Sequence, residues 1–166
     1  MQDKALSCEA MQQMAIFGGV SDEALRFLLA GSRVGAHGAG TLIAKEGDVA
    51  TGLYVLLVGR VAIQRRWNDR QILLRELGPG DCFGEMALLD LGPRSASVLA
   101  LHDCSALEMG TGLMHDFFEH DPRQFALMQM NIARELSRRL RTTFDVLFSA
   151  ANETERELIE RSLRRN

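Results

Sequence analysis

The sequence contains only three cysteines, and none of them belongs to a Cys-x-x-Cys pair. Cys8, Cys82 and Cys104 lie far apart in the 166 residues, and the four histidines show no paired ligand spacing. Zinc and iron–sulfur sites need such spacings, so neither is expected. No Ser/His/Asp or Cys/His arrangement is visible, and the chain is predicted not to be an enzyme. We expect Cys82 and Cys104 to be reduced, small and buried apolar side chains.

Long apolar runs are absent as well. Every such run ends at a glycine or a charge well before the roughly 18 residues needed to span a membrane. The N-terminus, Met1-Gln2-Asp3-Lys4, has neither the basic nor the apolar region of a signal peptide, so we predict a cytoplasmic protein without a membrane partner. The formal net charge of -3 argues against a chain built chiefly to coat nucleic acid. The composition, 46% hydrophobic and 25% charged, is that of an ordinary globular protein.

The region from Ser32 to about Met109 has the texture of antiparallel β structure. Glycine is frequent there, and the segments between the turns are short and rich in β-branched residues. We expect strands at 41–44, 53–58, 61–64, 71–77, 97–101 and 104–109, with a polar hairpin tip at 65–70. Two short helices precede them, one at 6–16 and one after the N-cap signal of Ser21. Short strands without intervening helices predict a sandwich or a barrel.

The last third of the chain is predicted to be helical. A short helix at 112–118 ends before Asp121-Pro122, and a long helix runs from Arg123 to about Ser149, with Pro122 at a first helical position. A charged helix is expected from Glu153 to Arg165. The predicted domains are therefore 1–122, a β domain with N-terminal helices, and 123–166, the long helix with its charged tail.

The long helix carries an apolar stripe that suits a partner helix. The stripe consists of Ala133, Leu136, Leu140, Phe144 and Leu147. It predicts a homodimer through residues 123–149, although the same stripe could pack back on the β domain. The arginines at 134, 138, 139 and 141 are most simply a solvated helix face.

One stretch of the sequence predicts a cradle for a phosphate and a sugar: Phe83-Gly84-Glu85-Met86-Ala87-Leu88-Leu89, followed by Pro93-Arg94-Ser95-Ala96-Ser97-Val98. Gly84 has no side chain and lets the backbone approach a ligand closely. The residues after it favour a helical turn, whose free N–H groups bind an anionic phosphate. Arg94 can meet the same phosphate with a bidentate fork, whereas Glu85 suits a sugar hydroxyl or the arginine itself. Together these features describe a nucleotide site.

This stretch resembles the phosphate-binding cassette of cyclic-nucleotide-binding domains, the family of the bacterial catabolite activator protein and the regulatory subunits of protein kinase A. Further turns match in order from Phe17 to Phe148, among them Phe17-Gly18-Gly19-Val20-Ser21, Glu46-Gly47-Asp48 and Gly80-Asp81. The resemblance implies a mainly β fold. It would be a double-stranded β-helix, or jelly-roll, barrel with N-terminal helices and a long C-terminal dimerisation helix.

The resemblance also implies which residues bind the ligand. They are Gly84, Glu85, Met86, Ala87, Arg94, Ser95 and Ala96 in the cassette, Ile63, Leu74 and Leu77 on strands, and Thr143 on the long helix. The three strand residues also suit plain core positions, and Thr143 also suits a solvated hydroxyl. Phe144 stands where the activator has a hydroxyl that meets the base, and Ser95 could hydrogen-bond guanine, so both cAMP and cGMP remain candidates.

The sequence thus predicts a cyclic-nucleotide sensor that binds cAMP or cGMP, needs no further cofactor and switches its C-terminal helices toward an unknown partner protein. The alternative is a protein-interaction and dimerisation module whose cassette is vestigial. A cyclic dinucleotide receptor or a transcription factor is less favoured. Fewer than twenty residues follow Phe148, and they suggest one charged helix without a recognition helix, so direct DNA binding is not expected.

Overall fold

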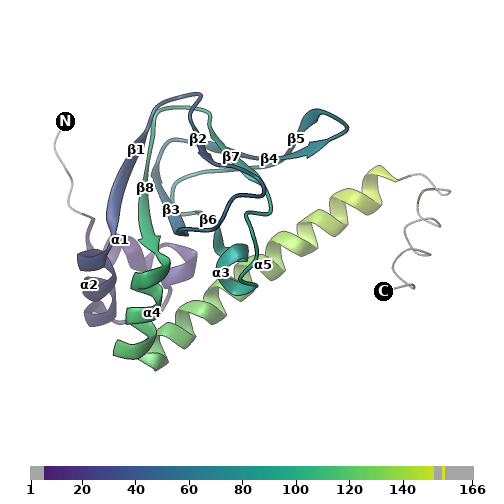
Figure 1. Cartoon of the computed structure of the whole chain (residues 1–166). Helices are drawn as coiled ribbons and strands as arrows, with labels where there is room; N and C mark the ends of the chain where they lie inside the picture. Colours follow the sequence, from purple (N-terminus) through teal and green to yellow (C-terminus); the bar gives the residue numbers. More distant parts are fainter. Residues whose placement is uncertain (1–5, 152–154, 156–166) are drawn as a thin grey trace. The chain divides into compact units, whose positions relative to one another are not determined.

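The computed structural model describes residues 6–151 and residue 155 (Figure 1). The chain divides into two compact units, Met1–Asn131 and Ile132–Asn166. The first contains all the strands and the cassette, and the second contains the greater part of the long C-terminal helix. The predicted charged helix at 153–165 lies, apart from residue 155, outside the described residues.

Eight strands form two antiparallel sheets of four. Sheet A has the order β1-β8-β3-β6 and consists of β1 (Arg33–His37), β8 (Cys104–Gly110), β3 (Gly52–Val58) and β6 (Cys82–Phe83). Sheet B has the order β2-β7-β4-β5 and consists of β2 (Leu42–Ala44), β7 (Ser97–Ala100), β4 (Val61–Trp67) and β5 (Arg70–Leu77). Among the described residues no strand ladder joins the two sheets, so the expected barrel is not closed and the molecule is an open sandwich.

The core lies between the sheets because alternate residues of each strand point inward. The inward-facing residues include Leu56 of β3, Ala106 of β8 and Val61 of β4, all fully buried. Leu53, Val55, Leu107 and Met109 occupy the alternate positions of sheet A and are also fully buried. The helix α4 (Thr111–His120) contacts β8, and α2 (Asp22–Gly31) contacts α4. Helices therefore pack against the outer face of sheet A.

The N-terminal helices are held by caps and by the start of the long helix. The Ser21 hydroxyl accepts a hydrogen bond from the Ala24 amide at 3.2 Å, which confirms the predicted N-cap of α2. The predicted helix at 6–16 is shorter, and consists of α1 (Cys8–Gln12) followed by the 3₁₀ turn η1 (Ala15–Phe17). The buried Asn131 side chain donates to the carbonyl oxygens of Ile16, at 3.3 Å, and Gly18, at 2.8 Å. The last turn of the first unit is thereby tied to its N-terminal segment.

The long helix α5 (Pro122–Ala150) begins at the proline, as predicted. In the second unit Glu135 pairs with Arg138 at 3.1 Å and with Arg139 at 3.0 Å, so part of the arginine cluster is ion-paired along the helix. The apolar residues Leu140, Phe144 and Leu147 are exposed.

One local expectation was wrong, and two strands were missed. The hairpin tip is not 65–70, because β4 and β5 continue to Trp67 and Arg70 and leave only Asn68 and Asp69 in the turn. Both turn residues have positive φ, 46° and 60°. Positive φ at both positions gives a two-residue turn whose twist matches that of the flanking strands. The strands β1 and β6 were not expected at all. Their sequences, Arg33–His37 and Cys82–Phe83, offer little or no alternation to detect.

The expectation that Cys82 and Cys104 are reduced and buried is confirmed. Cys82 and Cys104 are buried free thiols, and burial raises the pKa of the Cys104 thiol, with a smaller contribution from the charge of Asp103. Among the described residues no group of His, Cys, Asp and Glu side chains could hold a metal ion. No helix in that part of the chain is long and apolar enough to cross a membrane.

Candidate functional site

The cassette joins sheet A to sheet B through a short helix. After β6 the chain enters α3 (Glu85–Leu89), whose N-cap is Gly84. Gly84 has φ 82° and ψ 4°, a left-handed conformation that favours glycine. The predicted helical turn after this glycine is therefore confirmed. Its first backbone N–H groups have no partner within the helix and are suited to an anion.

Arg94 is the charge at the centre of the cassette, and it is buried, with 6% of its surface exposed. Its Nη2 donates to the Gly52 carbonyl at 2.9 Å and its Nη1 donates to the Gly84 carbonyl at 3.2 Å. The guanidinium carbon lies 5.4 Å from the centroid of the Tyr54 ring, within cation–π range. Tyr54 in turn stacks on Phe83 with ring centroids 5.0 Å apart. The arginine is thus fixed by two carbonyls and one aromatic face.

No carboxylate of the described residues forms an ion pair with Arg94. A buried charge is costly unless an opposite charge or a full set of hydrogen bonds compensates it. The guanidinium has five N–H donors, of which two are used here. Arg94 therefore retains donors and positive charge for an anionic ligand.

The space that Arg94 occupies depends on glycine at position 84. A Cβ atom added to Gly84 would lie 2.2 Å from Arg94 Nη1 and 3.0 Å from the Gly52 carbonyl oxygen. Gly84 is thus required for its conformation and for the close approach of the arginine. The sequence interpretation concerned the approach of a ligand to Gly84, and that part of it stays a prediction.

The main chain of Arg94 is anchored as firmly as its side chain. The Arg94 amide donates to the Asp48 carbonyl at 2.8 Å, and the Gly47 amide donates to the Arg94 carbonyl at 2.8 Å. The turn at residues 46–48, which matched the family pattern in sequence, therefore positions the cassette directly.

The other cassette residues surround this centre. Glu85 is buried at the first position of α3, with 6% of its surface exposed, and Ala87 is buried two residues further. Ser95 is exposed, and its hydroxyl donates to the sulfur of Met86 at 3.4 Å. Ala96 is half-buried just before β7.

The strand and helix residues differ in where they lie. Ile63 and Leu77 belong to or pack against the core between the sheets. Leu74 is 56% exposed, at the point in β5 where the pairing skips from Ile63–Arg75 to Gln64–Leu73. Thr143 lies on α5 in the second unit, where its hydroxyl donates to the Arg139 carbonyl at 2.9 Å.

Sequence reasoning missed two residues of the site, Tyr54 and Gly52. Tyr54 lies in the expected strand 53–58 and Gly52 directly precedes it, but their contacts with Arg94 span about forty positions of sequence. Alternation along β3 indicates that Tyr54 shares a face with Leu56, yet it cannot indicate which residue lies over its ring.

The chain matches the family described as "Cyclic nucleotide-binding domain" over residues 36–121. It is 31% identical over 136 residues to the "CRP-like cAMP-activated global transcriptional regulator" of Mycobacterium tuberculosis, covering 81% of this chain and 59% of that protein. It is 33% identical over 132 residues to the "Cyclic AMP receptor protein" of Thermus thermophilus, covering 79% and 59% respectively. The chain thus spans 59% of the length of both relatives.

A solved cyclic nucleotide-binding domain from Methylobacillus flagellatus has the same fold, with a TM-score of 0.78, 23% identity, and coverage of 87% of this chain and 82% of that one. The fold is that of the jelly-roll class, with flanking helices and a long C-terminal helix. The chain belongs to the cyclic nucleotide-binding domain family. The jelly-roll expectation is confirmed, with the correction that its two sheets remain separate. One of the two relatives is named as a transcriptional regulator and the other as a receptor protein.

Proposed function

We propose that this protein is a cyclic-nucleotide sensor that binds cAMP or cGMP at its cassette. One observation carries the proposal: Arg94 is a buried cation without a carboxylate partner among the described residues, next to the N-terminus of α3. A cyclic phosphate would supply the missing negative charge through charge-assisted hydrogen bonds. Two relatives that cover most of the chain are named for cAMP, which favours cAMP as the first ligand to test.

The proposed contacts follow the cassette. Arg94 would pair with the phosphate, with Ser95 and Ala96 beside it and the backbone of Met86 and Ala87 close to it. Glu85, as an acceptor, would bind a ribose hydroxyl, because a carboxylate is repelled by phosphate but accepts from an O–H group. Ile63, Leu74 and Leu77 would contact the apolar parts of the ligand, and Thr143 would meet the base.

Isothermal titration calorimetry with cAMP, cGMP and a cyclic dinucleotide tests the proposal. Wild type should bind one of the two cyclic mononucleotides. Arg94→Gln should weaken that binding about 100-fold or more, because removing one partner of a buried charge pair costs about 3–5 kcal/mol. Arg26→Gln is the matched control, since Arg26 is an exposed arginine on α2. Failure of the wild type to bind either mononucleotide, with its melting temperature unmoved, would instead favour a vestigial cassette and a ligand-independent interaction module.

The output of the sensor is proposed to pass through a homodimer of α5. Leu140, Phe144 and Leu147 recur at helical spacing and are 52%, 43% and 42% exposed, so a partner helix would bury them. Sedimentation velocity should show a dimer for the wild type and a monomer for Phe144→Asp, with Arg141→Asp as control. Ligand binding would bias the arrangement of the C-terminal helices toward a downstream partner protein. The proposed location is the cytoplasm, without direct DNA binding by residues 1–166.

A further inference from the structure

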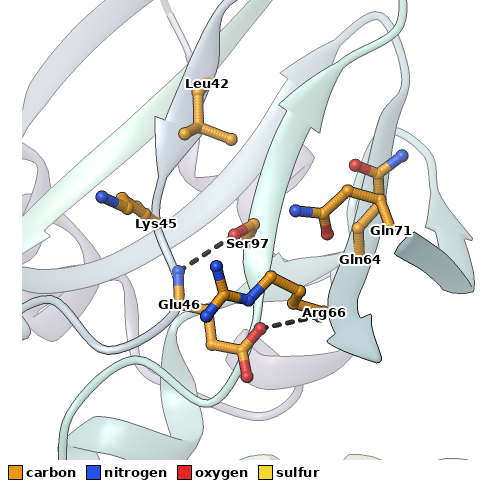
Figure 2. Close-up of a pocket in the computed structure, with 7 residues that line it drawn as sticks. All are labelled: Leu42, Lys45, Glu46, Gln64, Arg66, Gln71 and Ser97. Carbon is orange, nitrogen blue, oxygen red and sulfur yellow. Dashed lines mark hydrogen bonds between the residues drawn. The ribbon is translucent and has the colours of Figure 1, made fainter. Parts of the chain in front are cut away.

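The outer face of sheet B carries a second pocket, of about 700 Å³. That volume lies within the range of about 300–1,000 Å³ that small-molecule sites occupy. The lining residues are Leu42, Lys45, Glu46, Gln64, Arg66, Gln71 and Ser97 (Figure 2). Ser97 is the one residue that these share with the cassette stretches 83–89 and 93–98, and the expected ligand-binding residues 84–87 and 94–96 are not among them.

Strand register places this pocket on the face opposite the core. Gln64 pairs with Ser97, and Arg66 pairs with Gln71, so these four side chains share one face of sheet B. They alternate with Ile63, which packs against the core between the sheets. The β4–β5 hairpin extends past the end of β7 (Figure 1).

The charges that line the pocket favour an anion. Lys45 and Arg66 are exposed cations, and neither has a carboxylate within 4 Å among the residues that the structure describes. Glu46 is the acid in the lining, and it is already engaged: Oε2 accepts from the Arg66 amide at 2.9 Å and Oε1 accepts from Arg65 Nε at 3.3 Å. The charges of Arg65 and Arg66 both act on Glu46. Together with Lys45 these arginines give three cations beside one acid, so the pocket keeps a net positive charge.

The neutral polar groups of the pocket are available as well. Within the described part of the chain, the side-chain amides of Gln64 and Gln71 make no hydrogen bond to protein. The Ser97 hydroxyl accepts from the Glu46 amide at 3.0 Å, and its own hydrogen remains free to donate (Figure 2). Leu42 adds an apolar wall. Two cations, two amides, a hydroxyl and an apolar wall suit a small organic anion.

The pocket and the cassette share a segment of main chain. Lys45 and Glu46 line the pocket, and Gly47 and Asp48, which follow directly, exchange 2.8 Å backbone hydrogen bonds with Arg94. A ligand that displaces residues 45 and 46 would therefore move the groups that hold the cassette arginine.

We propose that this pocket is a second site, which binds a small organic anion through its carboxylate or phosphate and is coupled to the cassette through residues 45–48. The binding part is independent of the proposed function, whereas the coupling part rests on it. Coupling is reciprocal. If the anion changes the affinity for a cyclic nucleotide by some factor, the cyclic nucleotide changes the affinity for the anion by the same factor.

Amide NMR of the full chain tests the binding part. Citrate and glycerol phosphate serve as the carboxylate and phosphate probes, at constant ionic strength adjusted with sodium chloride. Saturable shifts should centre on residues 45, 64, 66, 71 and 97 for at least one probe. Arg66→Gln and Lys45→Gln should each weaken that binding at least about tenfold, because each removes a charge-assisted hydrogen bond. Arg70→Gln, an exposed cation of β5 outside the lining, should leave it unchanged.

A cassette variant separates this site from the proposed nucleotide site. Arg94→Gln should bind the anion as the wild type does. Amide shifts confined to Gly84 and Arg94 would overturn the second site. Equal anion affinity of Arg66→Gln and the wild type would overturn it too. Calorimetry with cAMP at saturating anion then tests the coupling. An unchanged cAMP affinity overturns the coupling alone, and a wild type that binds the anion but no cyclic nucleotide overturns the proposed function while the second site stands.

Discussion

Replacing Gly84 by alanine tests whether Arg94 really occupies the space above this residue. Two costs follow from the structure. The first is conformational, because φ at Gly84 is 82°, and a left-handed conformation costs a residue with a Cβ about 1–2 kcal/mol. The second is steric, because the new Cβ would lie 2.2 Å from Arg94 Nη1. The guanidinium would have to withdraw from the carbonyls of Gly84 and Gly52, and each lost hydrogen bond costs about 1 kcal/mol.

Gly40 offers a matched control. Its φ is 81°, almost the same as that of Gly84, but an added Cβ would meet nothing within 4 Å. Gly40→Ala should therefore lose only the conformational cost, about 1–2 kcal/mol, against about 3–4 kcal/mol for Gly84→Ala. A difference of about 2 kcal/mol corresponds to about 4–8 °C in melting temperature for a chain of this size.

Differential scanning calorimetry of both variants measures this difference. The same scan on Arg94→Gln, with and without Gly84→Ala, completes a double-mutant cycle. The extra cost of Gly84→Ala should shrink in the Arg94→Gln background, because the shorter side chain leaves room for the methyl group. Equal melting temperatures for Gly84→Ala and Gly40→Ala would refute the reasoning, since the arginine would then not fill the space.

Three further predictions concern other parts of the first unit. Hydrogen bonding from the Arg66 amide, with smaller contributions from Arg65, lowers the pKa of Glu46 below its ordinary 4.5. The wild type should therefore be more stable than Glu46→Gln above pH 4.5 in urea unfolding, and the difference should vanish as pH falls through the lowered pKa. Iodoacetamide should modify Cys8 much faster than Cys82 and Cys104 in the native protein, as mass spectrometry would show. Asn131→Ala should reduce the free energy of unfolding by about 1–3 kcal/mol in urea unfolding, because it leaves buried carbonyls unsatisfied.

Each of these predictions has a contrary outcome. A stability difference for Glu46→Gln that persists at pH 2 would mean that the side chain acts through packing and not through its charge. Equal labelling of all three thiols would contradict the burial of Cys82 and Cys104. An unchanged unfolding curve for Asn131→Ala would mean that the two hydrogen bonds of Asn131 make no net contribution to the free energy of unfolding.

The predictable parts of the fold were those with a local physical signal. The Ser21 cap, the proline start of α5 and the helical turn after Gly84 each depend on a few adjacent residues, and all three are present. The strand β6 has two residues, too few for any period to appear, and its existence depends on pairing with Tyr54 and Val55. Whether the sheets close depends likewise on pairing between distant strands, which no local pattern specifies.

The candidate site divides in the same way. Gly84 and Arg94 could be singled out because a turn glycine and a fork-shaped cation each have a characteristic chemistry. The roles of Gly52 and Tyr54 could not be predicted, because they arise only when β3 is brought beneath the cassette. The second pocket was equally hidden, since Gln64, Arg66 and Gln71 converge only after the β4–β5 register is set.

The hydrogen bonds of Asn131 bear on where this chain can be cut. The family match begins at residue 36 and ends at residue 121, yet Asn131 binds the carbonyls of Ile16 and Gly18, and Phe17 is fully buried. A fragment trimmed to the matched span would lose Asn131 and both of its acceptors, together with α2 and most of β1. It would also expose the side of α4 that α2 covers. A fragment limited to the span by which the family is identified should therefore be less stable than the whole chain.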